Sequence, residues 1–281
     1  MSRIIIKEKH FHPAHTFDCG QCFRFLREDD GSYTGIAHKK VINVSMCDEG
    51  IVLKNAEKAD IKNIWHTFFD LGRDYGVIKK RLSGDRYVKT AIEFGWGIRI
   101  LRQEFFECLI SFIISANNNI PRIRSIVEKL CEMYGEKIQY NGKTYHTFPD
   151  TTTLFGIEEG DLAPLRAGYR AKYIADAVKM INRGMAYDEI ETMPIDMARK
   201  ELCKISGVGP KVADCVLLFA FGNLEAFPTD VWVKKVMSQL YKVDEKSAAK
   251  KGAELFGNDA GIAQQYLFYW MREGEKNGTK I

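Results

Sequence analysis

The sequence has no long apolar run, little net charge and no framework of paired cysteines. No stretch of its 281 residues is apolar over the length that a membrane-spanning helix needs. The N-terminal segment MSRIIIKEKHFH contains neither a long apolar core nor a small-residue cleavage site, so we expect no secretory signal. Seven cysteines, an odd number, favour a reducing compartment over a disulfide-stabilised secreted fold.

Metal-ligand patterns are scarce as well. Cys19-x-x-Cys22 is half of a zinc motif, but no second Cys-x-x-Cys or histidine pair occurs at a usual ligand spacing. No cysteine follows Cys215, so we expect no four-cysteine iron–sulfur cluster in the C-terminal part. Zinc at Cys19 and Cys22 is the alternative that these two cysteines leave open.

The sequence also lacks a low-complexity linker and a fixed-period repeat, so we expect its domains to pack together. A chain of this length can bury a sizeable core, as one large domain or as two to three small ones. A hydrophobic content of 46% and a charged content of 28% are typical of a globular protein. The net charge of +4 permits nucleic-acid binding where basic residues cluster.

Two kinds of pattern divide the chain. Over residues 22–55, alternating β-branched and aromatic residues separated by Asp-Gly and Glu-Gly turns predict an antiparallel sheet. Helical periodicity follows over residues 59–100 and continues, helix after helix, from Gln103 onward. We therefore predict an α+β fold, with a sheet domain at 1–102 packed on a mostly helical core at 103–281.

The segment from Ser206 to Val212, Ser-Gly-Val-Gly-Pro-Lys-Val, carries the most specific local signal. Pro210 suits the first position of a helix, where its missing N–H would have no partner, and Gly222 suits the end of that helix. The two glycines allow a tight turn and a close approach by a neighbouring group. Such a hairpin leaves amide N–H groups and a helix N-terminus facing outward, which predicts a site for a DNA phosphate.

Each of these features also has an ordinary structural explanation. Gly-Val-Gly can be a plain helix–helix turn, Lys211 a solvated first-turn lysine and Asp230 a helix N-cap. Their order and spacing, however, resemble the helix-hairpin-helix–Gly/Pro–Asp superfamily of DNA glycosylases, in the branch whose catalytic residue is a lysine. The resemblance implies a helix-hairpin-helix at about residues 196–222.

Four further segments resemble the 8-oxoguanine DNA glycosylases within that superfamily and extend the resemblance over nearly the whole chain. They come from separate places, which makes their combination specific: LRQEFFECLISFIISANNNIPRI, GYRAKYI, KVADC and GIAQQYLF. The resemblance implies a bifunctional DNA glycosylase and lyase that flips 8-oxoguanine out of duplex DNA and excises it in base excision repair.

The resemblance makes Lys211 the nucleophile that attacks C1′ of the damaged nucleotide. A neutral lysine amine can displace the base, form a Schiff base with the opened sugar and allow β-elimination of the 3′ phosphate. The carboxylate of Asp230 can stabilise positive charge on the sugar, orient the nucleophile and cap a helix. Phosphate binding is the alternative role for Lys211, whereas the two roles of Asp230 are compatible.

A second group of residues is expected to hold the extruded base. Cys215 and Phe268 match the residues on its two faces, Phe219 matches part of the pocket wall, and Gln264 matches the residue at the Watson–Crick edge. The carbonyl of Gly20 matches the backbone carbonyl with which the family recognises N7 of the base. N7 is a hydrogen-bond acceptor in guanine and a donor in 8-oxoguanine. Core packing is the alternative explanation for the cysteine, the glutamine and Phe268.

A third group is expected at the opposite strand. The asparagine triplet at residues 117–119 matches the segment that fills the gap left by the flipped base, although asparagines at a helix end can also be caps. Asn117, Arg122 and Arg170 match residues that hydrogen-bond the orphaned cytosine, and Tyr169 matches a wedge beside it. Because the rigid fork of an arginine suits the acceptors of cytosine, the resemblance implies a preference for cytosine opposite the lesion.

The hairpin itself is expected to bind the DNA backbone, with no cofactor needed for the reaction. In the family, backbone carbonyls at this turn hold a monovalent cation, and a hard cation prefers such oxygen ligands. The expected phosphate contacts are Gly207, Val208, Gly209 and Lys211, and the carbonyls that match the cation site are those of Cys203, Ile205 and Val208.

The sequence departs from the animal members of the family at two positions. Trp232 stands where they carry a histidine near the 5′ phosphate, and Phe219 replaces a different apolar residue, so details of the lesion contacts differ.

Two alternatives remain: a related enzyme for alkylated bases, which shares Asp230 but lacks the lysine, and a DNA-binding module without activity. We expect the protein to be a monomer that binds double-stranded DNA, and we expect it to bind no membrane. Its expected location is the cytoplasm, at the nucleoid in a prokaryote, or the nucleus in a eukaryote.

Overall fold

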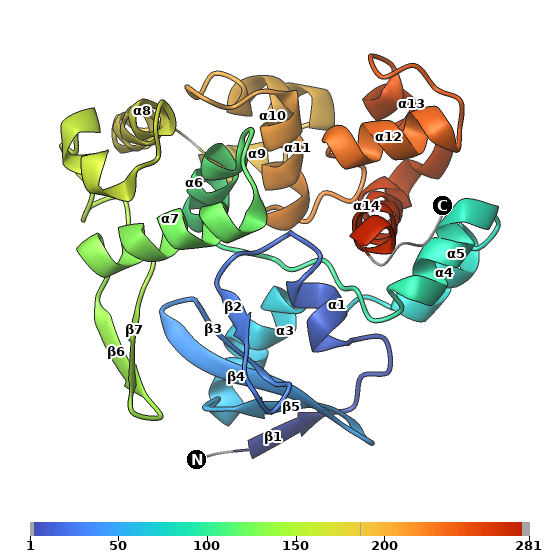
Figure 1. Cartoon of the computed structure of the whole chain (residues 1–281), viewed down its shortest axis with the longest axis horizontal. Helices are drawn as coiled ribbons and strands as arrows, with labels where there is room; N and C mark the ends of the chain where they lie inside the picture. The colour runs from blue at the N-terminus through green and yellow to red at the C-terminus, as the bar shows by residue number, and fades with distance from the viewer. Residues whose placement is uncertain (1–2, 186, 277–281) are drawn as a thin grey trace.

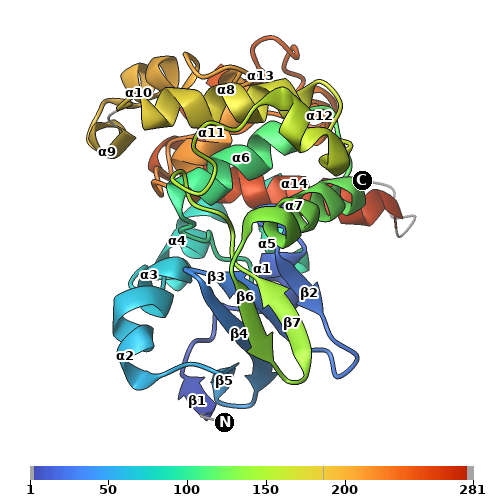
Figure 2. The same cartoon turned by 90° about the vertical axis from the view of Figure 1, so that its left-hand side faces the viewer.

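A computed structural model describes residues 3–185 and 187–276 of the chain. An antiparallel sheet formed by the N-terminal residues lies below a mostly helical part in Figure 1, and the view in Figure 2 shows the same two layers from the side. The predicted α+β fold class, with an N-terminal antiparallel sheet packed on a helical core, is therefore confirmed.

The sheet has the strand order β1-β5-β4-β3-β2, and every neighbouring pair is antiparallel. The turns after β3 and β4 join adjacent strands, as expected for a meander. The strands are β1 (Arg3–Ile6), β2 (Phe25–Arg27), β3 (Tyr33–Ala37), β4 (Lys40–Cys47) and β5 (Gly50–Lys54). The sequence pattern predicts four of them but misses β1, which pairs with β5 about fifty residues away along the chain.

Aromatic side chains fill the space between this sheet and the segments that cover it. Phe17 of α1 (Pro13–Phe17) stacks on Phe25 of β2, with ring centroids 4.1 Å apart and planes nearly parallel. Trp65 and Phe69, from the π-helical turn Ile61–Trp65 and the residues after it, complete the cluster. Burying aromatic rings at this density anchors the segment that precedes Asp18 and Gly20.

The rest of the described chain is mainly helical. The helix α6 (Phe105–Ser115) is apolar on all sides, and its residues from Cys108 to Ile114 are buried. They pack against α7 (Ile120–Tyr134), α8 (Arg170–Asn182) and α11 (Pro210–Phe219). The helices before it are α2 (Lys58–Asp60), α3 (His66–Phe68), α4 (Tyr75–Leu82) and α5 (Arg86–Phe94). The later ones are α6 (Phe105–Ser115), α7 (Ile120–Tyr134), α8 (Arg170–Asn182), α9 (Tyr187–Ile190), α10 (Ile195–Leu202), α11 (Pro210–Phe219), α12 (Val231–Gln239), α13 (Ala248–Phe256) and α14 (Ala260–Lys276), with 3-10 turns η2 (Glu159–Leu165) and η3 (Gly257–Asp259).

One hairpin interrupts the helical part and was not predicted. Strands β6 (Lys137–Tyr140) and β7 (Lys143–His146) are joined by Asn141 and Gly142, both with positive φ. The Asn-Gly pair is the expected signal of a two-residue hairpin turn, so the prediction of helix after helix is wrong for this segment. Tyr140 packs against Ile36 of the main sheet, and the hairpin runs down beside that sheet in Figure 1.

The C-terminal helix α14 links the two parts of the molecule. It packs against both α5 and α12, and Arg81 of α4 forms a double hydrogen bond of 2.7 and 2.8 Å with Asp259 just before it. Gln265 of α14 also donates a 2.5 Å hydrogen bond to the carbonyl of Cys19. The residues around Gly20 are therefore fixed to a helix that follows them by more than two hundred positions.

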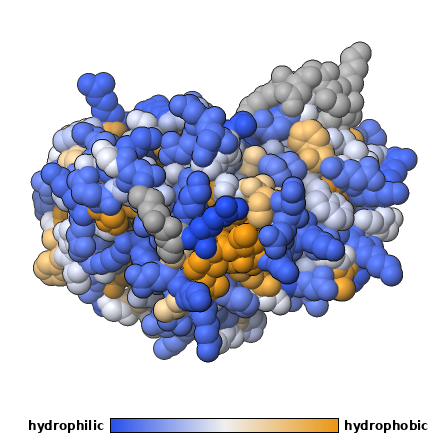
Figure 3. Space-filling view, turned by 90° about the horizontal axis from the view of Figure 1, so that it is seen from below, coloured by the Kyte–Doolittle hydropathy of each residue, from blue (hydrophilic) through white to orange (hydrophobic). Residues whose placement is uncertain are grey.

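The surface seen from the sheet side is mostly hydrophilic, with apolar side chains gathered near its centre (Figure 3). Among the described helices, none combines the length and apolar character needed to cross a membrane.

Candidate active site

The hairpin between α10 and α11 is shaped by one constrained glycine. Gly207 has φ +82, and a Cβ at this position would lie 2.6 Å from the ring of Tyr173. Gly209 has extended backbone angles, and a Cβ there would meet nothing within 4 Å. Pro210 is the first residue of α11, as predicted, but the helix ends at Phe219, three residues before Gly222. Only Gly207 is therefore required by the fold of the turn.

We expect Gly207→Ala to lower the free energy of unfolding by about 1–3 kcal/mol, the usual strain of a non-glycine residue in this region. The clash with Tyr173 should also shift the hairpin and weaken binding to duplex DNA. Chemical denaturation and a DNA titration measure the two effects. Gly209→Ala is the matched control, and equal destabilisation by both variants would contradict this explanation.

Lys211 and Asp230 line the same cavity from different segments. Lys211 lies in the first turn of α11, with Nζ 3.4 Å from Oγ of Ser115 and 5.1 Å from the ring centre of Phe112. Asp230 is the N-cap of α12, and its Oδ1 accepts hydrogen bonds from the amides of Trp232 and Val233 at 3.0 and 2.9 Å. The carboxylate thus caps the helix and also faces the cavity that contains the lysine.

Burial sets the protonation of the groups around this cavity. Desolvation raises the pKa of Asp230, although the amide of Val233 and the charge of Lys211 oppose the shift. Burial raises the pKa of the Cys215 thiol to about 12, so this side chain is a neutral, apolar surface rather than a thiolate. Cys215 therefore adds no charge to the cavity wall at neutral pH.

The groups described above line one cavity of about 40 Å³. Its lining brings together all the residues predicted for catalysis and for the base pocket. They are Gly20, Lys211, Cys215, Phe219, Asp230, Gln264 and Phe268, joined by Phe112, Pro228 and Gln265.

Two residues with hydrogen-bonding groups line the cavity from opposite parts of the chain. Gln264 is 4% exposed, and its Oε1 has no hydrogen-bond partner among the described residues. Gly20 has φ +78, a conformation that other residues rarely adopt. A buried acceptor without a partner is costly unless a ligand supplies a donor, so the glutamine is suited to recognise one.

The residues predicted for the opposite strand form a second cluster, around the turn that joins α6 to α7. Arg170 is only 4% exposed, and its guanidinium donates to the carbonyls of Ala116, Ala167 and Asn117 at 2.5–3.2 Å. Asn117 has φ +48, and Tyr169 is half exposed above the arginine. Arg170 therefore holds this strained turn in place, while the side chain of Asn117 faces solvent.

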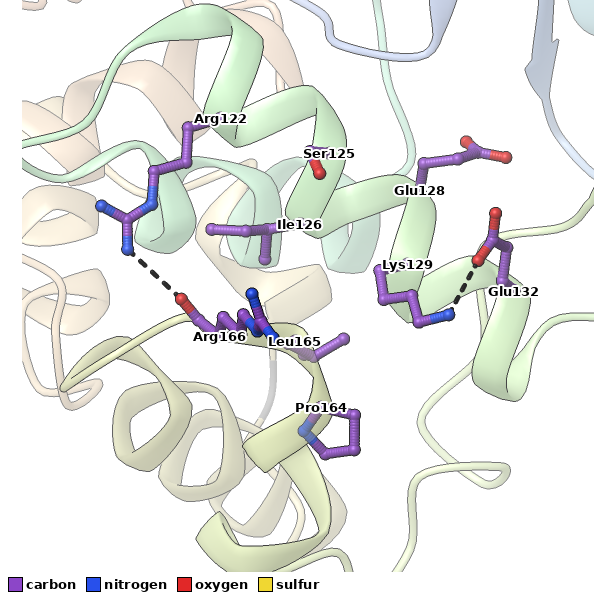
Figure 4. A pocket seen from close by; sticks show the side chains of 9 residues that line it. All are labelled: Arg122, Ser125, Ile126, Glu128, Lys129, Glu132, Pro164, Leu165 and Arg166. Carbon is purple, nitrogen blue, oxygen red and sulfur yellow. Dashed lines mark hydrogen bonds and ion pairs between the residues drawn. The ribbon is translucent and has the colours of Figure 1, made fainter.

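Arg122 differs from Arg170 because it is exposed. Its guanidinium donates a 3.3 Å hydrogen bond to the carbonyl of Arg166, across the mouth of a groove of about 650 Å³ (Figure 4). The groove runs between α7 and the end of η2, and Figure 4 shows how these side chains face one another. The lining comprises Arg122, Ser125, Ile126, Glu128, Lys129, Glu132, Pro164, Leu165 and Arg166.

The structure also places the residues considered for metal ions. Among the described residues, no group of three or more His, Cys, Asp or Glu side chains is arranged to hold one. Cys19 donates to the carbonyl of Thr16 and accepts from Gln21, which gives it a structural role. At the hairpin, the Ile205 carbonyl already accepts the amide of Val208 at 3.0 Å, so one of its lone pairs remains for a cation.

Sequence reasoning missed three residues near the cavity. Phe112 stacks on Phe219 with ring centroids 5.4 Å apart and lies beneath Lys211, yet it reads as one more apolar residue of α6. Gln265 and Arg272 of α14 contact the segment around Gly20. Gln265 and Arg272 are seven residues apart and share one face of α14, and Arg272 follows Phe268 by four positions, which is the signal that could have identified it.

Both parts of the chain match known protein families. Residues 3–109 match the 8-oxoguanine DNA glycosylase N-terminal domain, and residues 110–258 match the HhH-GPD superfamily of base excision DNA repair proteins.

Solved structures and curated relatives are similar over most of the chain. The crystal structure of the Clostridium acetobutylicum 8-oxoguanine glycosylase/lyase, in complex with double-stranded DNA containing cytosine opposite 8-oxoG, has a TM-score of 0.92 and 46% identity, covering 95% of this chain and 93% of that one. A probable N-glycosylase/DNA lyase of Methanothermobacter thermautotrophicus is 32% identical over 231 residues, covering 74% of this chain and 72% of the relative. N-glycosylase/DNA lyase OGG1 of Arabidopsis thaliana is 27% identical over 288 residues, with coverages of 90% and 75%. The chain therefore belongs to the 8-oxoguanine DNA glycosylases, within the HhH-GPD superfamily of base excision DNA repair enzymes.

Proposed function

We propose that this enzyme excises 8-oxoguanine from double-stranded DNA and then cleaves the strand at the resulting site. The observation that carries the proposal is the shared cavity of Lys211 and Asp230, which is also lined by Gln264, whose buried Oε1 has no hydrogen-bond partner among the described residues. An amine, a carboxylate and a recognition group are the parts that base excision by a lysine requires.

In the proposed reaction, the lone pair of the neutral Lys211 amine attacks C1′ and the C1′–N9 bond breaks. The base leaves with the bonding electrons and takes up a proton, while the new secondary amine loses one. The sugar ring then opens as its O4′ leaves C1′, which gives the Schiff base. Loss of a proton from C2′ expels the 3′ phosphate by β-elimination, and water finally releases the lysine.

Asp230 is proposed to stabilise the positive charge that develops on the sugar, which requires its ionised form. Because burial raises the pKa of this carboxyl, excision should decline on acidification at a higher pH than the ordinary aspartate value of 3.8 implies. Asp230→Asn should keep the cap bonds, lose this acid limb, and excise about thirtyfold more slowly, a change of about 2 kcal/mol. Single-turnover rates across pH measure both effects.

The same pKa shift has the opposite consequence for stability. A carboxyl whose folded pKa is raised is less favourable when ionised in the folded state than in the unfolded one. Its contribution to stability is present below the unfolded pKa and is lost as pH rises through the folded pKa. Asp230→Asn should therefore be at least as stable as the wild type at neutral pH, and a marked loss of stability there would contradict the assignment.

Base recognition is proposed to use three sides of the cavity. The carbonyl of Gly20 would accept the N7–H that distinguishes 8-oxoguanine from guanine, and Gln264 would bind the Watson–Crick edge. Cys215 and Phe268 would contact the two faces of the base, and Phe219 would form part of the wall. The neutral thiol at Cys215 supports this role, because a charged group against the ring would need its own partner.

The cluster around Arg170 is proposed to contact the base left in the opposite strand, with a preference for cytosine. Arg122 and Asn117 are exposed and would turn toward it, and Tyr169 would separate it from its neighbour. The Clostridium acetobutylicum relative was crystallised with cytosine opposite 8-oxoG, which supports the same pairing here.

The hairpin of Gly207, Val208 and Gly209, together with Lys211, is proposed to bind a phosphate of the damaged strand, with the protein acting as a monomer. Outward amides in the first turn of α11 favour an anion there. A monovalent cation held by the carbonyls of Cys203, Ile205 and Val208 would attract the phosphate further.

Borohydride trapping on a duplex with 8-oxoguanine tests the proposed function against its alternatives. A lysine enzyme forms a Schiff base that borohydride reduces to a stable covalent adduct. An enzyme for alkylated bases that activates water, or a DNA-binding module, gives none. Absence of an adduct with the active wild type would overturn the lysine mechanism.

A further inference from the structure

A buried arginine of α14 lies directly behind the turn that carries the Gly20 carbonyl. Arg272 is 5% exposed, and its Nη2 donates to the carbonyl of Asp18. Its Nε donates a 2.7 Å hydrogen bond to Glu273, while Nη1 has no partner among the described residues. A buried charged group that lacks some of its hydrogen bonds destabilises a fold, so the burial of this guanidinium indicates a function that offsets the cost.

The contacts of Arg272 reach two parts of the base pocket. A Cβ on Gly20 would lie 2.9 Å from Nη1 of the arginine and 3.2 Å from the ring of Phe268. The guanidinium also lies over the Phe268 ring, 5.0 Å from its centre. The glycine that reads N7 and the aromatic ring that covers the base are thus packed against one cation.

The neighbouring residues of α14 complete this attachment. Gln265 is 2% exposed and donates to the carbonyl of Cys19, one residue after the carbonyl that Arg272 holds. Two consecutive carbonyls before Gly20 are therefore fixed by side chains of the same helix that carries Gln264. This arrangement sets the direction of the next carbonyl, that of Gly20 itself, relative to Gln264, which would bind the Watson–Crick edge of the base.

We propose that Arg272 is a positioning residue for lesion recognition, which fixes the carbonyl of Gly20 and the ring of Phe268 in the geometry that 8-oxoguanine requires. The inference rests on the proposed function of the cavity. The arginine acts through the glycine and the phenylalanine and takes no part in bond breaking. Its loss should impair the excision of the base but spare strand cleavage at a site that has already lost its base.

Arg272→Met and Arg272→Lys test this division of roles. Single-turnover excision of 8-oxoguanine by the methionine variant should fall about tenfold, which is below the roughly hundredfold that a misplacement of 1 Å can cost. Cleavage of a duplex with a preformed abasic site should stay at the wild-type rate, and the lysine variant should recover part of the excision. Arg81→Met, which removes a more exposed arginine paired beside the start of α14, is the control and should excise normally.

A base analogue with carbon in place of N7 separates positioning from general damage to the pocket. It keeps the 8-oxo group but offers no N7–H to the carbonyl of Gly20. In the Lys211→Gln background, adding Arg272→Met should weaken binding of the 8-oxoguanine duplex more than binding of the analogue duplex, which loses only the positioning of Phe268. Equal weakening on both duplexes, or slower cleavage at the abasic site, would overturn the proposal.

The same measurements show whether the proposed function itself fails. A wild type that neither excises 8-oxoguanine nor forms a trapped adduct contradicts the proposed function. A wild type that does both, with excision by the Arg272 variants unchanged, contradicts only the role of this arginine. If the methionine variant does not fold, the comparison of Arg272→Lys with wild type on the two duplexes decides the question.

Discussion

Lys211→Gln should reduce excision of 8-oxoguanine by at least about 10³-fold, which corresponds to about 4 kcal/mol in the activation barrier. The change removes the amine that lies beside Asp230 in the cavity, and it adds neither bulk nor a new charge. Trapping with borohydride should be lost together with excision, because both need the same nitrogen. Duplex binding should change little, since backbone amides of the hairpin remain to hold the phosphate.

Lys204→Gln provides a matched control for the lost charge. Lys204 lies just before the hairpin, is exposed, and pairs with Glu201 at 2.6 Å, so its removal alters the local charge equally without touching the cavity. We expect normal excision and trapping by this variant. Substantial excision by Lys211→Gln would show that another group or water attacks C1′, and Lys211 would then be a phosphate contact.

The residues that lie close together in the sequence were the ones that sequence reasoning placed well. The hairpin, the start of α11 at Pro210 and the capping role of Asp230 follow from local backbone chemistry, which the residue types determine directly. The cavity also contains every residue predicted for catalysis and base binding, although the resemblance to a known family, rather than local chemistry, brought Gly20 and Phe268 into the prediction.

Contacts between distant segments could not be predicted in the same way. Strand β1 is a short apolar segment that is a strand only because β5 lies beside it. Arg272 reads as a charged residue near the end of the chain, and its burial depends on Asp18, which is 254 positions away. The hairpin of β6 and β7 did have a local signal in Asn141-Gly142, but the helical patterns on both sides of it led to the prediction of a continuous helical part.

Arg170 shows how the structure refines a role that the sequence only outlines. The family resemblance treats it and Arg122 as equivalent readers of cytosine. Here one guanidinium is buried and bonded to two carbonyls of the turn and to the carbonyl of Ala167, while the other is exposed at the mouth of the groove. We therefore expect Arg122 to contact the opposite base directly and Arg170 to act first by holding Asn117.

The wild-type enzyme should excise 8-oxoguanine opposite cytosine on the order of a hundredfold faster than opposite adenine. Cytosine offers O2 and N3 as acceptors to guanidinium groups and its N4 amine as a donor to the side-chain amide oxygen of Asn117. Adenine would place a donor against a donor, and each buried group left unpaired costs about 1–3 kcal/mol. Two such mismatches give the hundredfold, since about 1.4 kcal/mol corresponds to tenfold. Single-turnover rates with each of the four opposite bases measure the preference.

The two arginines should lose this preference in different ways. Arg122→Ala should flatten the selectivity while leaving the protein as stable as the wild type, because within the described part of the chain its side chain makes a single long hydrogen bond of 3.3 Å. Arg170→Ala should also flatten it, but with lower stability, because three backbone carbonyls lose a charged donor. Arg166→Ala is the matched control, since Arg166 contributes its carbonyl rather than its side chain to the contact with Arg122. Equal excision opposite cytosine and adenine by the wild type would mean that these arginines bind phosphates and do not read the base. If the wild type prefers cytosine and the Arg122→Ala variant keeps the same preference, the opposite base is instead recognised by the turn that Arg170 holds.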